Sequence, residues 1–339
     1  MTIGAATSTS ITACLTFLRP IINHPSFAGS IGRSMKLFSS SIASGLPTSS
    51  SVLKPMMIPS GTTTTKRVLL LRHGQALHNP RAEAARENGC SFDEFLNLMR
   101  EDDAFDSPLT ELGENQAMQA SKDLRQALYN IDMIVSSPLS RALRTADLVL
   151  PPELFVDSTK PRRVCVEELR EINGSFLNAK RRPRSELEDR FPHWNFEHIP
   201  DVDDSWTDEL ESHDECSERG YCGLIWLMQQ REQNIMVVCH GGLLNYTMNN
   251  HSRVVLADKR DMQDGQERRC ITKRFGNCEM REFRMALVWD SDDFSMYGKD
   301  KECKQENGEK SRPMIIMEEV TMEMDDSYAM TDDDNASMS

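Results

Sequence analysis

Histidine and arginine side chains follow three separate apolar runs of this sequence, close to the point where each run ends. With the small residues beside them, they are Arg72, His73, Gly74, Ser137, Arg141, His240 and Gly241. A neutral imidazole is a nucleophile that accepts a phosphoryl group, and a planar guanidinium matches the geometry of phosphate oxygens. Glycine beside such groups admits backbone amides to a phosphate without an intervening side chain. The set therefore predicts a site for phosphoryl transfer.

The elements that must position these residues are short apolar runs separated by segments with helical spacing. Such runs are typical of buried parallel strands, and alternating strands and helices predict a parallel sheet covered on both faces. We expect strands at residues 67–71, 133–135 and 235–239, and helices at 109–128 with Thr110 as N-cap, at 138–150 with Pro138 in the first turn, and at 217–230. The predicted fold is α/β, a three-layer sandwich with a mostly parallel central sheet flanked by helices. Ligands of such sheets bind at the carboxyl ends of the strands, where the three runs deliver histidine and arginine.

Five stretches, taken in order, resemble the motifs of the histidine phosphatase (phosphoglycerate mutase-like) superfamily. They are residues 71–79, 106–113, 136–146, 169–174 and 237–242. The resemblance covers about residues 66–290 and implies the phosphoglycerate mutase-like fold. Within that superfamily, the chain is most similar to the plant and fungal phosphoglycerate mutase-like proteins. The stretches that carry this closer likeness are 72–79, 180–182, 191–192 and 277–279.

The resemblance implies a role for each residue of the site. His73 would attack phosphorus and become phosphohistidine. Arg72, Arg141 and, if protonated, His240 would stabilise the charge on the transferred group. Glu171 would protonate the leaving group and later accept a proton from water. Because fixed cations supply the positive charge, the scheme requires neither a metal nor a cofactor.

The choice of acid and the outer contacts rest on the same likeness. Glu167 and Glu168 lie close to Glu171 in the sequence, but the family places its acid in an L-x-E pattern that opens a loop ending in glycine. Further contacts to substrate are expected from Gly74, Asn79, Ser137 and Gly241. His78 is interpreted as a loop or helix-start residue.

The basic run Lys180, Arg181 and Arg182 has two interpretations: a contact for a second anionic group of the substrate, or a solvated run beside a helix. The stretch 82–106 predicts one amphipathic helix that could cap the site, with Phe92 and Leu96 on its apolar side.

The most favoured function is hydrolysis of a small phosphorylated metabolite through phosphohistidine. Phosphoglycerate mutases resemble one another in an E-R-H-Y-G stretch after the acid, whereas residues 171–175 read EINGS. Mutase-type phosphotransfer is therefore the alternative, and a noncatalytic phosphate-binding module on the same fold is another, because fold does not determine function. The natural substrate and the oligomeric state stay open.

Composition divides the chain into three parts. Residues 1–65 are rich in Ser and Thr and contain no acid, which is typical of a transit peptide for a mitochondrion or plastid; a disordered extension of a cytoplasmic protein is the alternative. Residues 66–292 form the expected histidine phosphatase domain. Residues 293–339 are expected to be an acidic, disordered tail, in which the apolar patch 314–317 could dock as a strand or turn.

Composition also excludes several classes of protein. The formal net charge of −14 disfavours binding to nucleic acid. The apolar stretch from Ile11 to Leu18 is too short to span a membrane, and no other segment approaches the required length. The cysteines form no C-x-x-C pair, which argues against a zinc site, and Cys165 and Cys239 are expected to fill the core.

Overall fold

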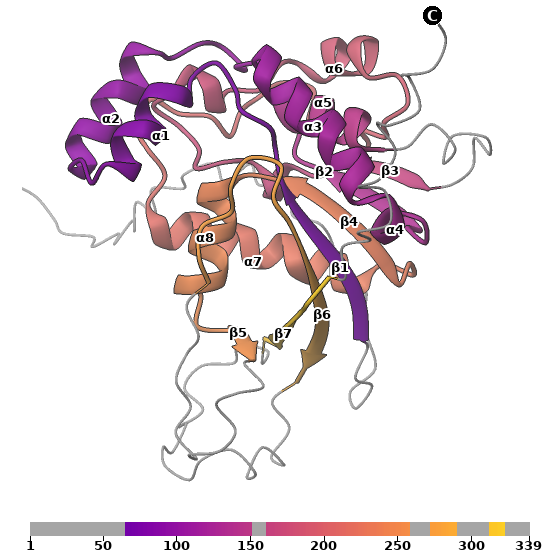
Figure 1. The fold of residues 1–339 in the computed structure, drawn as a ribbon. Helices are drawn as coiled ribbons and strands as arrows, with labels where there is room; N and C mark the ends of the chain where they lie inside the picture. The colour runs from indigo at the N-terminus through magenta and orange to yellow at the C-terminus, as the bar shows by residue number, and fades with distance from the viewer. Residues whose placement is uncertain (1–64, 151–160, 258–271, 290–311, 323–339) are drawn as a thin grey trace, which may run out of the picture. The chain divides into compact units, whose positions relative to one another are not determined.

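The computed structural model describes residues 65–150, 161–257, 272–289 and 312–322, and Figure 1 shows their arrangement. The expected presequence lies outside these ranges, apart from Thr65. So does most of the expected tail.

The described strands form one mixed sheet with the order β3-β2-β4-β1-β6-β7-β5. Their bounds are β1 Thr65–Arg72, β2 Met133–Ser136, β3 Arg162–Cys165, β4 Asn234–Cys239, β5 Val254–Ala257, β6 Met280–Val288 and β7 Met314–Val320. Neighbouring strands are parallel except where β6 pairs with β1 and with β7. The three strands expected from the sequence are β1, β2 and β4, which lie side by side.

Helices cover both faces of this sheet (Figure 1). Their bounds are α1 Pro80–Glu87, α2 Phe92–Glu101, α3 Glu111–Asp123, α4 Arg125–Leu128, α5 Ser140–Val149, α6 Arg184–Arg190, α7 His213–Gln229 and α8 Gly241–Asn250, with 3-10 turns at Glu167–Leu169 and Leu177–Ala179. Side chains alternate along β1, so that Val68 and Leu70 join the core under α7 and α8, whereas Leu69 and Leu71 join the core under α3, α4 and α5. The three-layer α/β fold is confirmed.

Local signals in the sequence explain where the long helices begin. The side chain of Thr110 accepts a hydrogen bond from the backbone N–H of Gly113, as an N-cap does, although the predicted helix divides into α3 and α4 near Leu124. Ser212 and Glu215 form a capping box, so α7 starts four residues earlier than expected. α5 begins at Ser140, which leaves Pro138 before the helix and not in its first turn.

The segment expected to be one helix over residues 82–106 is two helices. α1 ends at Glu87, and Gly89 then adopts a φ of 81°, a left-handed conformation that only glycine adopts without strain. Ser91 caps the start of α2 by accepting from the N–H of Glu94. The chain therefore turns between α1 and α2, which pack against each other.

The apolar patch of the expected tail is a strand. Met314–Val320 forms β7, which pairs antiparallel to β6 and parallel to β5. Ile315 and Met317 are fully buried in the core under α7. The patch therefore docks as a strand, one of the two conformations expected for it, and these seven residues are not part of a disordered tail. The alternation of Ile315 and Met317 supplies one apolar face of the strand.

Within the described ranges, no helix combines the length and the apolar character needed to cross a membrane. Cys165 and Cys239 are both buried free thiols, as expected of core residues.

Candidate active site

His73 follows directly after β1 and is almost completely buried. Its Nδ1 lies 2.6 Å from the carbonyl oxygen of Gly74. A carbonyl only accepts, so the proton of the neutral ring is on Nδ1, and Nε2 keeps its lone pair. Burial lowers the pKa of His73 well below its usual 6.5, and the charges of Arg141 and Arg72 lower it further. The structure thus presents a neutral imidazole whose Nε2 carries the lone pair.

Arg141, in the first turn of α5, faces this atom. Its Nε donates to Nε2 of His73 across 3.3 Å, and its Nη1 donates to the carbonyl of Asn178 across 2.7 Å. The remaining nitrogen, Nη2, is buried and finds no hydrogen-bond partner among the described residues. Burial lowers the pKa of the guanidinium to about 10, so Arg141 stays charged at neutral pH.

Arg72, the last residue of β1, is the second buried guanidinium. Its Nη1 donates to the carbonyl of Phe275 across 2.9 Å, and its Nη2 pairs with the carboxylate of Glu83 on α1. Its Nε is buried without a hydrogen-bond partner in the described part of the chain. A Cβ on Gly241 would lie 3.0 Å from this Nε, so glycine at the start of α8 leaves the room that Arg72 occupies.

His240 precedes α8 and is completely buried. Its Nε2 shares a hydrogen bond of 2.8 Å with Oγ of Ser137, and its ring centre is 4.9 Å from that of His73. Burial and the charge of Arg141 lower the pKa of His240 well below 6.5. Both effects favour the neutral form of His240, so it adds the third positive charge considered from the sequence only when it takes up a proton.

Glu171 lies across from these cations at the start of α8. Its carboxylate accepts hydrogen bonds from the backbone N–H groups of Ile172, Gly242 and Leu243, at 3.0, 3.1 and 2.9 Å. The last two belong to the first turn of α8, where the helix dipole stabilises negative charge. These contacts hold the carboxylate in one position at the wall of a cavity.

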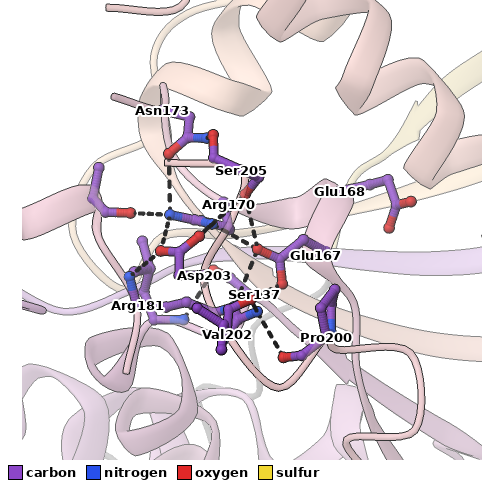
Figure 2. Close-up of polar contacts among 12 residues, drawn as sticks. Ser137, Glu167, Glu168, Arg170, Asn173, Arg181, Pro200, Val202, Asp203 and Ser205 are labelled. Atoms are coloured by element: carbon purple, nitrogen blue, oxygen red, sulfur yellow. Dashed lines mark hydrogen bonds and ion pairs between the residues drawn. The ribbon is translucent and has the colours of Figure 1, made fainter. Parts of the chain in front are cut away.

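The two neighbouring acids are placed differently. Glu167 is held in ion pairs with Arg170 and Arg181 (Figure 2). Glu168 takes no part in that network, and burial raises its pKa to about 7. Of the three candidates, Glu171 lines the cavity.

Gly74 has a different role from the one expected. Its N–H already donates to Oγ1 of Thr145, which in turn donates to the carbonyl of Arg141. A Cβ at this position would lie 2.4 Å from the carbonyl oxygen of Gly113. Glycine is therefore required here because the first turn of α3 approaches closely, and not to bring a backbone amide to a phosphate.

Asn79 and His78 form a hydrogen-bonded pair close to His73. Oδ1 of Asn79 accepts from the N–H of Ala76 across 3.1 Å, so its amide nitrogen Nδ2 must be the atom that donates to Nε2 of His78, also across 3.1 Å. The neutral ring of His78 therefore carries its proton on Nδ1, which is buried without a partner among the described residues. Burial, Arg141 and Arg72 lower the pKa of His78 well below 6.5.

His78 is thus a site residue that sequence reasoning missed. As expected, it lies in the loop just before α1, but it is also buried and lines the cavity with Asn79. The pairing of a histidine with the asparagine of the first motif was a signal that could have identified it.

The basic run 180–182 does not line the cavity. Nε of Arg181 pairs with Glu167, its Nη2 donates to the carbonyls of Pro200 and Val202, and its side chain is completely buried (Figure 2).

The other two residues of the run also have partners. Lys180 lies over the ring of Trp206, 4.1 Å from its centre. Arg182 pairs with buried Asp106 and with Glu186. Through these contacts the run stabilises the conformation of the loops that follow β3.

The cavity beside the site has a volume of about 280 Å³. Of the predicted site residues, Arg72, Asn79, Glu171 and Gly241 line it. His73, Arg141, Ser137 and His240 are buried behind that wall, joined to it by the bond from Arg141 to Asn178, which is itself a lining residue. No group of three or more His, Cys, Asp or Glu side chains suited to a metal ion occurs in the described ranges.

Known proteins resemble this chain in sequence. Phosphoglycerate mutase-like protein 1 of Arabidopsis thaliana is 28% identical over 261 residues, which cover 69% of this chain and 84% of that protein. Phosphoglycerate mutase-like protein 2 of the same plant is 25% identical over 325 residues, which cover 81% and 89%. The resemblance to phosphoglycerate mutase-like proteins is confirmed.

Solved structures resemble part of the chain as well. The ecdysone phosphate phosphatase of Bombix mori, in complex with tungstate, is 18% identical, covers 65% of this chain and 89% of its own, and has a TM-score of 0.39. A mycobacterial glucosyl-3-phosphoglycerate phosphatase is 18% identical, covers 64% and 89%, and has a TM-score of 0.36. The sequence pattern of one family matches residues 68–272, well over half of the chain. From that match, this chain belongs to the histidine phosphatase superfamily, branch 1.

Proposed function

We propose that this protein is a phosphomonoesterase that hydrolyses a small phosphorylated metabolite through a phosphohistidine at His73. One observation carries the proposal. A buried neutral imidazole, with its proton held on Nδ1, lies beside two buried guanidiniums whose Arg72 Nε and Arg141 Nη2 have no hydrogen-bond partner among the described residues. Buried donors without partners are costly, and the oxygens of a phosphoryl group are acceptors that would satisfy both.

In the first step, the lone pair of His73 Nε2 attacks phosphorus and the bond from phosphorus to the ester oxygen breaks. The hydrogen bond from Arg141 Nε to Nε2 is given up, and the guanidinium donates to the phosphoryl oxygens instead. Glu171, in its protonated form, gives its proton to the departing alkoxide, which leaves as an alcohol.

In the second step, water attacks phosphorus and the bond from phosphorus to Nε2 breaks. Glu171, now a carboxylate, accepts the proton of the water, so the acid is regenerated and inorganic phosphate is released. Arg72 and Arg141 supply the charge stabilisation in both steps, and no metal is required by this scheme.

His78 and Asn79 complete the proposed phosphate site. The proton on His78 Nδ1 is a donor without a protein acceptor in the described part of the chain, and Asn79 determines that tautomer. We assign His78 as a contact to the phosphoryl group and Asn79 as the residue that positions His78. Asn79 was expected from the sequence to contact the phosphate itself, so its proposed role changes.

Hydrolysis is preferred over mutase-type phosphotransfer because a mutase must hold a second anionic group of its substrate. The run 180–182, which was the candidate for that contact, is engaged with Glu167, Trp206 and Asp106 and lies outside the cavity lining. This placement supports a phosphatase.

The test is phosphate release by the full chain from a panel of phosphoesters in the presence of EDTA. We expect turnover that is abolished in His73→Ala and retained in His193→Ala, since His193 is an exposed histidine outside the cavity lining. Rapid quenching with a ³²P-labelled ester should trap a label that is stable to alkali and labile to acid, as phosphohistidine is. An acid-stable label, or turnover that EDTA abolishes, would contradict the mechanism.

We further propose that residues 1–65 deliver the protein to a mitochondrion or plastid and are then removed. The absence of acidic residues before Glu83 supports this proposal. Mass analysis of the native protein tests it, because an intact start at Met1 or Thr2 would contradict removal.

A further inference from the structure

The cavity beside the phosphate site has a wall of large apolar side chains. α2 contributes Phe92, Phe95, Leu96 and Met99 to the lining, which are spaced as one face of a helix. Such a face normally lies in a core, yet no residue of α2 is buried and Phe92 is 54% exposed. The apolar face of α2 is directed at the cavity, and the described part of the protein buries Phe95, Leu96 and Met99 only partly.

A series of ring contacts connects this face of α2 to helix α8. The ring of Phe92 lies 6.1 Å from that of His213, edge to face, and the ring of His213 stacks on Tyr246 at 4.0 Å. Tyr246 lies on α8, one helical turn after Gly242, whose N–H binds the carboxylate of Glu171. Residues four apart share a helix face, so the aromatic wall continues directly from the proposed general acid.

The loop after Glu171 adds two further apolar side chains to the lining. Ile172 directly follows Glu171, and Phe176 lies at the end of the same loop. A ligand whose phosphoryl group meets Arg72 and whose leaving oxygen meets Glu171 therefore has its leaving group between Ile172, Phe176 and α2. A polyhydroxylated or carboxylated leaving group would lose its hydration against Ile172, Phe176 and α2, which is costly.

From this geometry, and resting on the proposed function, we infer that the substrate is the phosphate monoester of an apolar alcohol, with a long aliphatic or aromatic leaving group. Two cations, Arg86 and Arg274, also line the cavity, and both lie against its aromatic rings. Arg86 lies 4.7 Å from the ring centre of Phe95 and 4.0 Å from Glu83, and Arg274 lies 5.8 Å from the ring centre of Tyr246. Both guanidiniums cover aromatic faces and extend the flat walls of the cavity.

The experiment is a series of n-alkyl phosphates from ethyl to octyl, all below their micelle concentrations. Their leaving alcohols have nearly the same acidity, so the series varies apolar length alone. Full burial of each methylene would raise kcat/KM about fourfold, and we expect at least a tenfold rise from ethyl to octyl phosphate. 3-Phosphoglycerate and glucose 6-phosphate should be poorer substrates than octyl phosphate.

Two leucines of the chain form a matched pair of variants. Leu96→Gln places an amide in the wall and should flatten the dependence on chain length. Leu112→Gln makes the same change at an exposed helix position outside the lining and should leave the dependence unchanged. Equal flattening in both variants would overturn the assignment to this wall.

The failure of this inference is distinguishable from failure of the proposed function. Turnover with equal rates for ethyl and octyl phosphate, or with a preference for the two polar esters, would overturn the apolar substrate and leave the phosphatase intact. If no ester is hydrolysed, calorimetry can still measure whether binding depends on apolar chain length. The ligands for this measurement are n-alkylphosphonates, which carry no ester bond to cleave. Octylphosphonate should bind at least tenfold more tightly than ethylphosphonate, and equal or absent binding would overturn the inference.

Discussion

The amide nitrogen of Asn79 donates to Nε2 of His78 across 3.1 Å and thereby determines which nitrogen of a buried ring carries the proton. Because Oδ1 of Asn79 is occupied by the N–H of Ala76, the amide cannot turn over without losing that bond. The consequence is a fixed donor, Nδ1 of His78, beside Arg72 and Arg141.

Asn79→Asp should reverse this tautomer, since a carboxylate accepts and cannot donate to Nε2. We expect kcat/KM to fall by about tenfold to a hundredfold, the worth of one hydrogen bond to a charged group. ¹⁵N chemical shifts of the His78 ring would report the change from an Nδ1 proton to an Nε2 proton. In a His78→Phe background, the same substitution should cost less, and full additivity of the two losses would exclude the proposed coupling.

Stability should fall as the pH drops below about 6.5. The pKa values of His73, His78 and His240 are lowered by burial, so these rings stay neutral in the folded state while the unfolded chain takes up protons. The contribution is fully present above pH 6.5, and each ring removes up to about 1.4 kcal/mol of stability per pH unit below it. Urea unfolding between pH 7 and pH 5.5 measures the slope. His240→Asn should reduce that slope, whereas His193→Ala should not; equal slopes in all three proteins would refute the assignment.

Arg181→Gln should destabilise the protein by about 3–5 kcal/mol, because it leaves the buried carboxylate of Glu167 with one cation fewer. Lys180→Gln, one residue earlier at a partly exposed position, should cost far less. Urea midpoints compare the two variants. If the Arg181→Gln protein were as stable as the wild type and had a raised KM, the basic run would be assigned to substrate binding instead.

β7 is expected to contribute strongly to stability. Met317→Ala should lower the free energy of unfolding by about 2–5 kcal/mol, because the side chain is completely buried in the core under α7. Glu319→Ala, on the same strand and exposed, provides the comparison. Equal midpoints in urea would show that this strand is dispensable.

The central part of the fold was predictable because its signals are local. The run from Arg67 to Leu71 is apolar on both faces of one strand, and Thr110 and the capping box at Ser212 mark helix starts within a few residues. The position of His73 and His240 after such runs follows from the rule for parallel sheets, and the structure brings both rings within 4.9 Å.

The remaining features depend on contacts that sequence spacing does not reveal. Whether Arg181 is solvated or paired depends on Glu167 and on carbonyls of the loop at residues 200–202. The packing of α2 against α1 depends on the turn at Gly89, which one continuous apolar stripe in the sequence did not reveal. His78 was not assigned to the site because its burial and its hydrogen bond with Asn79 are visible only in the structure.

The order of strands in the sheet has a consequence for how the protein is made. Val254–Ala257 pairs with Ile315–Glu318 and with no other described strand, so it leaves the ribosome well before its partner has been synthesised. One edge of β6 likewise stays unpaired until β7 has been synthesised. A nascent chain therefore exposes open strand edges until Met314–Val320 emerges, and during that interval chaperones have an unpaired edge to protect.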